Sequence, residues 1–358
     1  MARYKQYNCF YGYIFAIFIN MKHSFRNDYN VLAHPRILEA LSRCQNEIFD
    51  AYGLDIHSEK AAKYIKNVFG SNNAEVFFLT GGTQTNMVFI SYCLRNYEGV
   101  IACDTGHINV HETASIEGSG HKIITVENVN GKLSAQDILN VLDKFNDEHM
   151  VKPRMVYISN STETGSIYSF EELKAIHEVC QKRNLYLFID GARLGVALTS
   201  KENDIEPRMF GGLCDAFYVG GTKNGLLYGE ALVINNKELA KDFRYHIKNK
   251  GAMLAKGFVV GLQFEEIFKD GLYFELAKKS NENAKKLKDI LTKHHINILP
   301  SPTNQIFAEC EKEAGYALLN EFMLEKWEEK ENTLIVRFVT SFFTNEDDLN
   351  AVEDFLNR

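Results

Sequence analysis

Three stretches of this 358-residue sequence combine residue types that could do chemistry together. The turn TGGTQTN (80–86) offers backbone N–H groups and hydroxyls at a helix N-terminus, which suits a phosphate. Glycines in such a turn often serve only to let the backbone pack closely. LYLFIDGARL (185–194) ends an apolar run with Asp190 and Arg193, and buried charges are costly unless something compensates them. Lys223 follows another apolar run and two glycines, a setting for a desolvated amine that forms Schiff bases or for a lysine that reaches solvent.

Together these stretches match the requirements of pyridoxal phosphate. This cofactor takes a lysine for its aldehyde carbon, an acid for its pyridine nitrogen and a cradle for its phosphate. We therefore expect Lys223 and Asp190 to face a bound pyridoxal phosphate. The turn matches neither the dinucleotide pattern GxGxxG nor the P-loop pattern GxxxxGK[ST], so nucleotide cofactors lose support.

His107 and its neighbours allow two interpretations. His107 and His111 lie four residues apart and Glu112 follows, so a metal site is conceivable. The segment HETAS lacks the second histidine of HExxH, and the nearby sequence offers no third ligand, so we expect no metal here. An imidazole of His107 stacked on the pyridine ring fits better, with His111 as a structural hydrogen-bonding residue.

The elements that must position these residues follow from the hydrophobic pattern. Apolar runs without strict alternation are typical of strands buried on both faces, and they alternate here with amphipathic segments such as the helix expected after Ser134. This order predicts a three-layer α/β fold with a mostly parallel sheet, whose ligands bind at the carboxyl ends of the strands. The expected strands are EVFFL (75–79), GVIACD (99–104), HKIITVE (121–127), RMVYIS (154–159), LYLFID (185–190), DAFYVG (215–220) and ALVIN (231–235).

The chain divides into three expected parts: an N-terminal extension (1–21), a large cofactor-binding domain (22–250) and a smaller α+β domain (251–358). Cys9–Asn20 is aromatic and apolar but too short to span a bilayer, and it lacks a signal-cleavage site. We therefore expect no membrane partner.

Composition and charge argue against several kinds of partner and site. The formal charge of -7 and the lack of a Lys/Arg-rich stripe argue against nucleic acid as a partner. The seven cysteines are scattered, and none forms a Cys-x-x-Cys pair. This pattern favours reduced thiols in the cytoplasm over a disulfide framework or a zinc site.

The order of the motifs resembles the threonine aldolase / β-eliminating lyase family of fold-type-I pyridoxal phosphate enzymes. The resemblance runs from Asn27 to the C-terminus and includes the opening segments RNDYNVLAHPRILEAL (26–41) and AYGLD (51–55). The motifs that carry it are GGTQTN, CDTGHINVHE, IDGARLG, GGTKNG and VRFVTSF.

The resemblance implies roles for individual residues. Lys223 is the lysine joined to the cofactor, Asp190 contacts the pyridine nitrogen, and His107 stacks on the ring and assists proton transfer. The resemblance also implies binding residues: Gly82, Thr83 and Gln84 for the phosphate, Thr222 and Arg193 for the cofactor, and Arg193 with Arg337 for the substrate carboxylate.

The sequence departs from the family pattern at two places. Ser159–Thr162 followed by Glu163 stands where relatives often carry Glu-Asn-Thr-His, so a histidine used near the substrate hydroxyl is missing, and Glu163 could fill part of that space. Gly-Gly-Thr rather than Leu-Ser precedes the lysine. The departures leave the physiological substrate open.

The expected reaction is cleavage of the Cα–Cβ bond of a β-hydroxy amino acid to glycine and an aldehyde, with His107 or a water that it holds as base. A β-eliminating lyase, an aminotransferase and a non-catalytic phosphate-binding protein remain alternatives. The resemblance also implies a homodimer or homotetramer, in which Tyr52 and Lys256 are candidates for groups donated across the interface.

Overall fold

The computed structural model describes residues 23–358, so the expected extension at 1–21 lies outside the described residues. These residues form two compact units, Val31–Lys278 and a second unit of residues 23–30 with 279–358. None of the described helices has both the length and the apolar character needed to cross a bilayer.

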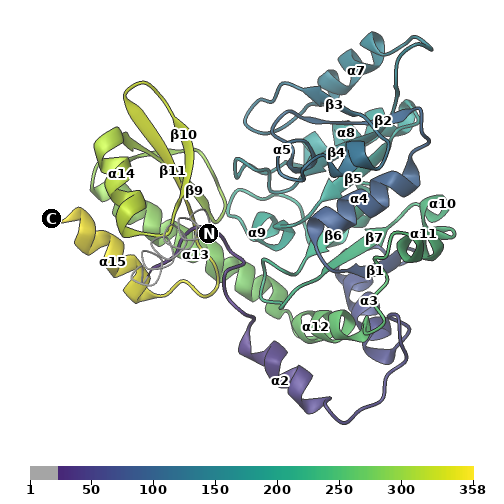
Figure 1. The fold of residues 1–358 in the computed structure, drawn as a ribbon, viewed down its shortest axis with the longest axis horizontal. Coiled ribbons are helices and arrows are strands. Elements are labelled where there is room, and N and C mark those ends of the chain that lie inside the picture. Colours follow the sequence, from purple (N-terminus) through teal and green to yellow (C-terminus); the bar gives the residue numbers. More distant parts are fainter. Residues whose placement is uncertain (1–22) are drawn as a thin grey trace, which may run out of the picture. The chain divides into compact units, whose positions relative to one another are not determined.

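The larger unit is built on a seven-stranded sheet of order β1-β7-β6-β5-β4-β2-β3 (Figure 1). The β2, β3, β4, β5 and β6 strands run parallel, whereas β7 is antiparallel to both of its neighbours. All seven expected strands are present, and the expected mostly parallel fold is confirmed. Their bounds are β1 (Glu75–Leu79), β2 (Glu98–Cys103), β3 (Ile123–Val126), β4 (Lys152–Ser159), β5 (Tyr186–Asp190), β6 (Ala216–Gly220) and β7 (Glu230–Ile234).

Helices cover this sheet because its strands carry apolar side chains on both faces. Met155 and Tyr157 of β4 join one core cluster with residues of α4 and α11, while Val156 and Ile158, which alternate with them along the strand, are also buried. The helices of this unit are α2 (Pro35–Arg43), α3 (Ile56–Val68), α4 (Gly82–Cys93), α5 (His107–Val110), α6 (Ser115–Gly118), α7 (Ala135–Lys144), α8 (Phe170–Lys182), α9 (Leu194–Leu198), α10 (Lys237–Ala240), α11 (Phe243–Asn249) and α12 (Phe258–Phe268), with a 3₁₀ turn η1 (Pro207–Gly212).

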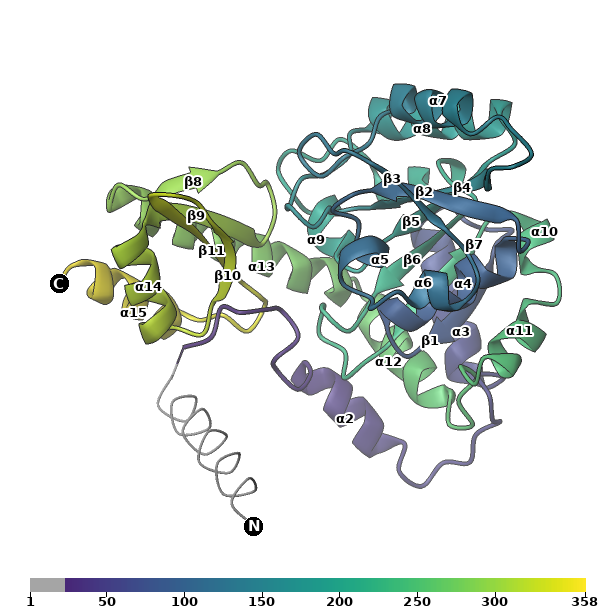
Figure 2. The same cartoon turned by 45° about the horizontal axis from the view of Figure 1, so that its top comes forward.

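Local sequence fixes where the expected helices begin. Ser134 and Asp137 form a capping box at the start of α7, and Ser169 and Glu172 form the same motif at the start of α8. Each pair satisfies backbone N–H groups that a helix start leaves without partners. The two helices pack together above the β3–β2–β4 end of the sheet (Figure 2).

The smaller unit is a four-stranded antiparallel sheet of order β10-β11-β9-β8 covered by helices. Phe25 belongs to its core, where its ring lies 6.3 Å from that of Phe322 and 5.7 Å from that of Phe338. The elements are β8 (Asn297–Leu299), β9 (Gln305–Glu311), β10 (Glu325–Glu329), β11 (Thr333–Val339), α14 (Lys312–Glu321) and α15 (Glu346–Leu356), with the later part of α13 (Leu272–Lys293).

The division between the units differs from the boundaries at 22 and 251 that the sequence suggests. Residues 23–30 lie with the smaller unit, and α12 lies with the larger one. The reason for the second difference is that α12 is apolar almost all round. It packs against α2, α3 and β1 of the larger unit.

Candidate active site

Five loops of the larger unit meet at one edge of the sheet. The carboxyl ends of β2, β4, β5 and β6 lie at this edge because these strands are parallel. The β1 strand ends there too, since it pairs with β7 in the opposite sense and β7 pairs with β6 in the opposite sense. The segments that begin at 80, 104, 160, 191 and 221 therefore converge, as the sequence predicts.

Asp190, at the end of β5, is held by four hydrogen-bond donors. Its Oδ2 accepts from Tyr157 Oη at 2.6 Å and from Asn86 Nδ2 at 3.0 Å. Its Oδ1 accepts from Tyr218 Oη and from the Ala192 N–H at 3.0 Å. Burial raises the pKa of this carboxyl, but the charge of His107 and these donors outweigh burial, so the pKa lies below its ordinary value. Asp190 is therefore an anion at neutral pH.

His107 is linked to Asp190 through two buried side chains. Its Nδ1 lies 2.8 Å from Glu112 Oε1, and Asn86 Nδ2 donates to the same oxygen at 2.8 Å. Asn86 thus joins Glu112 to Asp190. Glu112, which the sequence offered only as a conceivable metal ligand, orients the His107 imidazole instead. Asn86 was missed, although it stands in the GGTQTN motif.

Glu163 reaches this site from the loop after β4. Its Oε1 accepts from the His107 N–H at 3.0 Å and from Ser159 Oγ at 2.7 Å. Burial raises its pKa above the ordinary value, more than the Ser159 hydrogen bond lowers it. The Glu163 carboxyl therefore lies beside His107, and its place near a substrate stays a prediction.

The turn before α4 has the form of an anion cradle. Gly81 is the N-cap residue of α4 and offers no side-chain cap, so the N–H groups of the first turn are left for another partner. A Cβ on Gly82 would lie 2.8 Å from Tyr218 Oη, so a side chain at this position would push on the hydroxyl that bonds Asp190. Gln84 folds back, and its Oε1 accepts from the Thr80 N–H at 3.1 Å, while Thr83 is exposed.

Lys223 lies on the loop after β6 and is half-buried. Beside it, Glu230 at the start of β7 accepts from the Gly221 N–H at 3.0 Å. Burial raises the pKa of Glu230 to about 8, although hydrogen bonds and the charge of Lys223 oppose the shift. Thr222 Oγ1 accepts from the Gly229 N–H at 3.0 Å, which closes the loop. Glu230 was missed because the sequence places it before a strand rather than after one.

The two arginines have different settings. Arg193 is half-buried at the N-cap position of α9, three residues beyond Asp190 in the same loop. Arg337 lies on β11 of the smaller unit, where it pairs with Glu325 and donates to Gln305 Oε1 at 3.2 Å. The role of Arg337 toward a substrate stays a prediction.

The residues present fit pyridoxal phosphate. A buried carboxylate kept ionised suits a protonated pyridine nitrogen, an uncapped helix start suits a phosphate, and a half-buried lysine stands on a neighbouring loop. The close packing of β5 beside β6 leaves no room for a side chain directly after Asp190, since a Cβ on Gly191 would lie 1.8 Å from the Tyr218 carbonyl oxygen.

Comparison with known proteins agrees with this geometry. Residues 38–313 match the family model described as beta-eliminating lyase. A low specificity L-threonine aldolase of Pseudomonas sp. (strain NCIMB 10558) is 31% identical over 290 residues, which cover 80% of this chain and 84% of the relative. The solved structure of Leishmania major threonine aldolase is 43% identical, with a TM-score of 0.92, and covers 94% of this chain and 99% of its own.

A more distant structure supports the fold alone. Aspartate aminotransferase from Thermus thermophilus is 14% identical with a TM-score of 0.68 over 93% of this chain and 89% of its own. The expected fold-type-I architecture is confirmed by these neighbours. Since the family model spans most of the sequence, the chain is a member of the beta-eliminating lyase family.

Proposed function

We propose that this protein is a pyridoxal phosphate-dependent lyase that cleaves the Cα–Cβ bond of β-hydroxy amino acids such as threonine, giving glycine and an aldehyde. The family match and the threonine aldolases among its relatives support this reaction class. The observation that carries the proposal is the four-donor clamp on Asp190, joined through Asn86 and Glu112 to His107.

Each residue has a distinct task in this proposal. Lys223 supplies the amine that attaches the cofactor, and the start of α4 at Gly82, Thr83 and Gln84 binds its phosphate. Asp190 holds a proton on the pyridine nitrogen, because its clamp favours the ionised carboxylate. When bound, the cofactor supplies an electron sink for the electron pair released at Cα.

His107 is the proposed proton acceptor. With Nδ1–H donating to Glu112, its Nε2 is the basic nitrogen that takes the proton of the substrate hydroxyl, directly or through a water. The His107 side chain is 32% exposed, whereas that of Glu112 is 0% exposed. A buried carboxylate therefore fixes one nitrogen of the imidazole, while part of the ring stays accessible to a substrate. Glu163 beside it is the residue best placed to stand in for the histidine that relatives carry.

Substrate carboxylate recognition is proposed for Arg193 and Arg337, since a guanidinium matches a carboxylate in shape and charge. Thr222 and Arg193 complete the cofactor-binding set. The assembly is proposed to be a homodimer or homotetramer, with Tyr52 and Lys256 as donated groups. The six cysteines among residues 23–358 are free, which supports a cytoplasmic location.

The test is to offer the purified, cofactor-loaded protein L-threonine, L-allo-threonine and L-phenylserine and to follow aldehyde release. We expect aldehyde and glycine in equal amounts. Pyruvate from β-chloroalanine without any aldehyde from the three hydroxy amino acids would instead assign β-elimination. Conversion of the cofactor to its amine form by an amino acid, reversed by an oxo acid, would assign transamination.

A further inference from the structure

A second cluster of ligand-type side chains lies where α2, α3 and α12 meet, and it shares no residue with the candidate active site. Cys44 Sγ, a carboxylate oxygen of Glu47 and an imidazole nitrogen of His57 all lie within 4.8 Å of one another. Cys44 caps the C-terminus of α2, and the Glu47 N–H donates to the Cys44 carbonyl at 3.0 Å in the same turn. His57 stands in the first turn of α3. Thiol, carboxylate and imidazole therefore converge from two segments.

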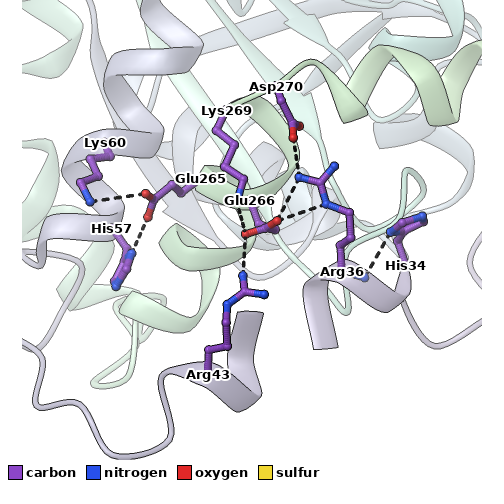
Figure 3. A network of polar contacts seen from close by, with 9 residues as sticks. All are labelled: His34, Arg36, Arg43, His57, Lys60, Glu265, Glu266, Lys269 and Asp270. Carbon is purple, nitrogen blue, oxygen red and sulfur yellow. Dashed lines mark hydrogen bonds and ion pairs between the residues drawn. The ribbon is translucent and has the colours of Figure 1, made fainter. Parts of the chain in front are cut away.

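The His57 ring is oriented as a metal-binding histidine would be. Its Nδ1 is hydrogen-bonded to Glu265 of α12, whose other oxygen lies 3.5 Å from Lys60 Nζ (Figure 3). Its Nε2 is buried and has no hydrogen-bond partner within residues 23–358, since Glu47 Oε2 is 3.9 Å away. A histidine fixed by a carboxylate at one nitrogen, with the other nitrogen bare, is the usual arrangement of a metal ligand.

The neighbouring contacts hold both segments in place before any ion binds. Arg43, the residue before Cys44, pairs with Glu266 of α12 at 3.2 Å, so adjacent acids of α12 anchor α2 and α3 (Figure 3). Phe49 of the connecting loop stacks on Phe258 with ring centroids 4.5 Å apart and lies 5.4 Å from the His57 ring. The ligand set is therefore largely preorganised.

We propose that Cys44, Glu47 and His57 bind a Zn²⁺ ion with a water as fourth ligand, and that the ion closes the loop between α2 and α3. Thiolate, imidazole and carboxylate ligands together favour zinc over the hard cations Mg²⁺ and Ca²⁺. Two zinc bonds of about 2.0 Å in a tetrahedron place their ligand atoms roughly 3.3 Å apart. The 3.9 Å between His57 Nε2 and Glu47 Oε2 needs only a small adjustment to reach that separation.

Zinc binding at this site must release a proton. A zinc-bound cysteine is a thiolate, so the proton of the metal-free Cys44 thiol must leave when zinc binds. Binding breaks the S–H bond, forms the S–Zn bond and passes the proton to buffer. The other charged groups near the cluster are Arg43, Lys60 and Glu265.

The sequence gives little sign of this site. It contains no Cys-x-x-Cys pair, and the scattered cysteines favoured reduced thiols over a zinc site. The three residues come together only in the folded structure, where the loop between α2 and α3 places His57 next to the turn that contains Cys44 and Glu47.

The test uses the full-length, cofactor-loaded protein, kept reduced with a phosphine and stripped of metal with a chelator. Zinc is then titrated by calorimetry in buffers of different ionisation enthalpy. We expect one zinc per chain with a Kd of about 1 µM or tighter and one proton released per zinc. Cys44→Ser and His57→Gln should each weaken binding at least about 100-fold, and Glu265→Gln roughly 10- to 100-fold.

The matched control is Cys310→Ser, a half-exposed thiol of the smaller unit that should leave zinc affinity unchanged. Zinc bound by the wild type no more tightly than by Cys44→Ser would overturn the proposal. So would an equal loss in Cys310→Ser, which would mark adventitious thiol binding. If His57→Gln unfolds, as seen by circular dichroism, Cys44→Ser and Glu47→Gln at half-buried and exposed turn positions decide the question.

Discussion

Two carboxyl groups at the same edge of the sheet, Asp190 and Glu230, are equally buried but differ in ionisation. Asp190 is 3% exposed and Glu230 is 4% exposed. Two phenols, an amide and a backbone N–H donate to Asp190, and its pKa is lowered. Glu230 has fewer donors, and burial raises its pKa to about 8. The charge of His107 and the larger number of donors, not the depth of burial, keep Asp190 an anion at neutral pH.

The largest expected effect comes from removing the ionised member of this pair. Asp190→Asn should lower kcat/KM for L-threonine by about 10³-fold, because a preorganised charge at the reacting system is lost. Glu230→Gln should leave kcat/KM near the wild-type value at pH 7, because the neutral amide imitates the protonated acid. Steady-state aldehyde release measures both. Equal losses in the two variants would contradict the distinction between the acids.

Removing one donor should give an intermediate effect. Tyr157→Phe or Tyr218→Phe takes one hydroxyl from the Asp190 carboxylate, and a hydrogen bond to a charged group is worth about 1.5–3 kcal/mol. We expect kcat to fall by roughly 10-fold or more, since each 1.4 kcal/mol is a factor of ten. Tyr273→Phe is the control, because its buried hydroxyl accepts from the Gly195 N–H and does not bond Asp190. The pH profile of kcat should show its acid limb moved to higher pH in the two test variants alone.

The smallest expected effect is on stability. The folded-state pKa of Glu230 is raised from 4.5 to about 8, so the folded protein holds this proton where the unfolded chain has lost it. Stability should therefore fall as pH rises from about 4.5 to 8, and Glu230→Gln should flatten this part of the plot of Tm against pH. Glu148→Gln, at an exposed acid, should keep the wild-type slope. If the Tm of Glu230→Gln fell with rising pH as steeply as that of the wild type, the raised pKa of Glu230 would be contradicted.

The comparison also shows why the sequence revealed one acid and not the other. Asp190 ends a run that reads as a buried parallel strand, and ligands gather at such ends. Glu230 lies at the same edge of the sheet only because β7 runs antiparallel to β6, and no local sequence pattern predicts that direction. Lys223 and His107 also follow expected strands, so the sequence could predict all seven strands and the loops that carry these candidate residues.

The partners that tune these groups could not be predicted. Asn86, Tyr157 and Tyr218 contact Asp190 from three different elements, and their contacts depend on the strand register. The place of α12 in the larger unit was missed for a related reason. The sequence of an apolar helix predicts that the helix is buried, but it does not predict which elements the helix packs against.

The most direct measurement is the mass of the peptide that contains Lys223 after the protein has been supplied with pyridoxal phosphate and reduced with borohydride. The account predicts that this peptide gains one cofactor-derived group on Lys223 and that Lys223→Ala abolishes both the modification and aldehyde release. A Lys223 peptide of unchanged mass, or a cofactor found on another lysine, would contradict it.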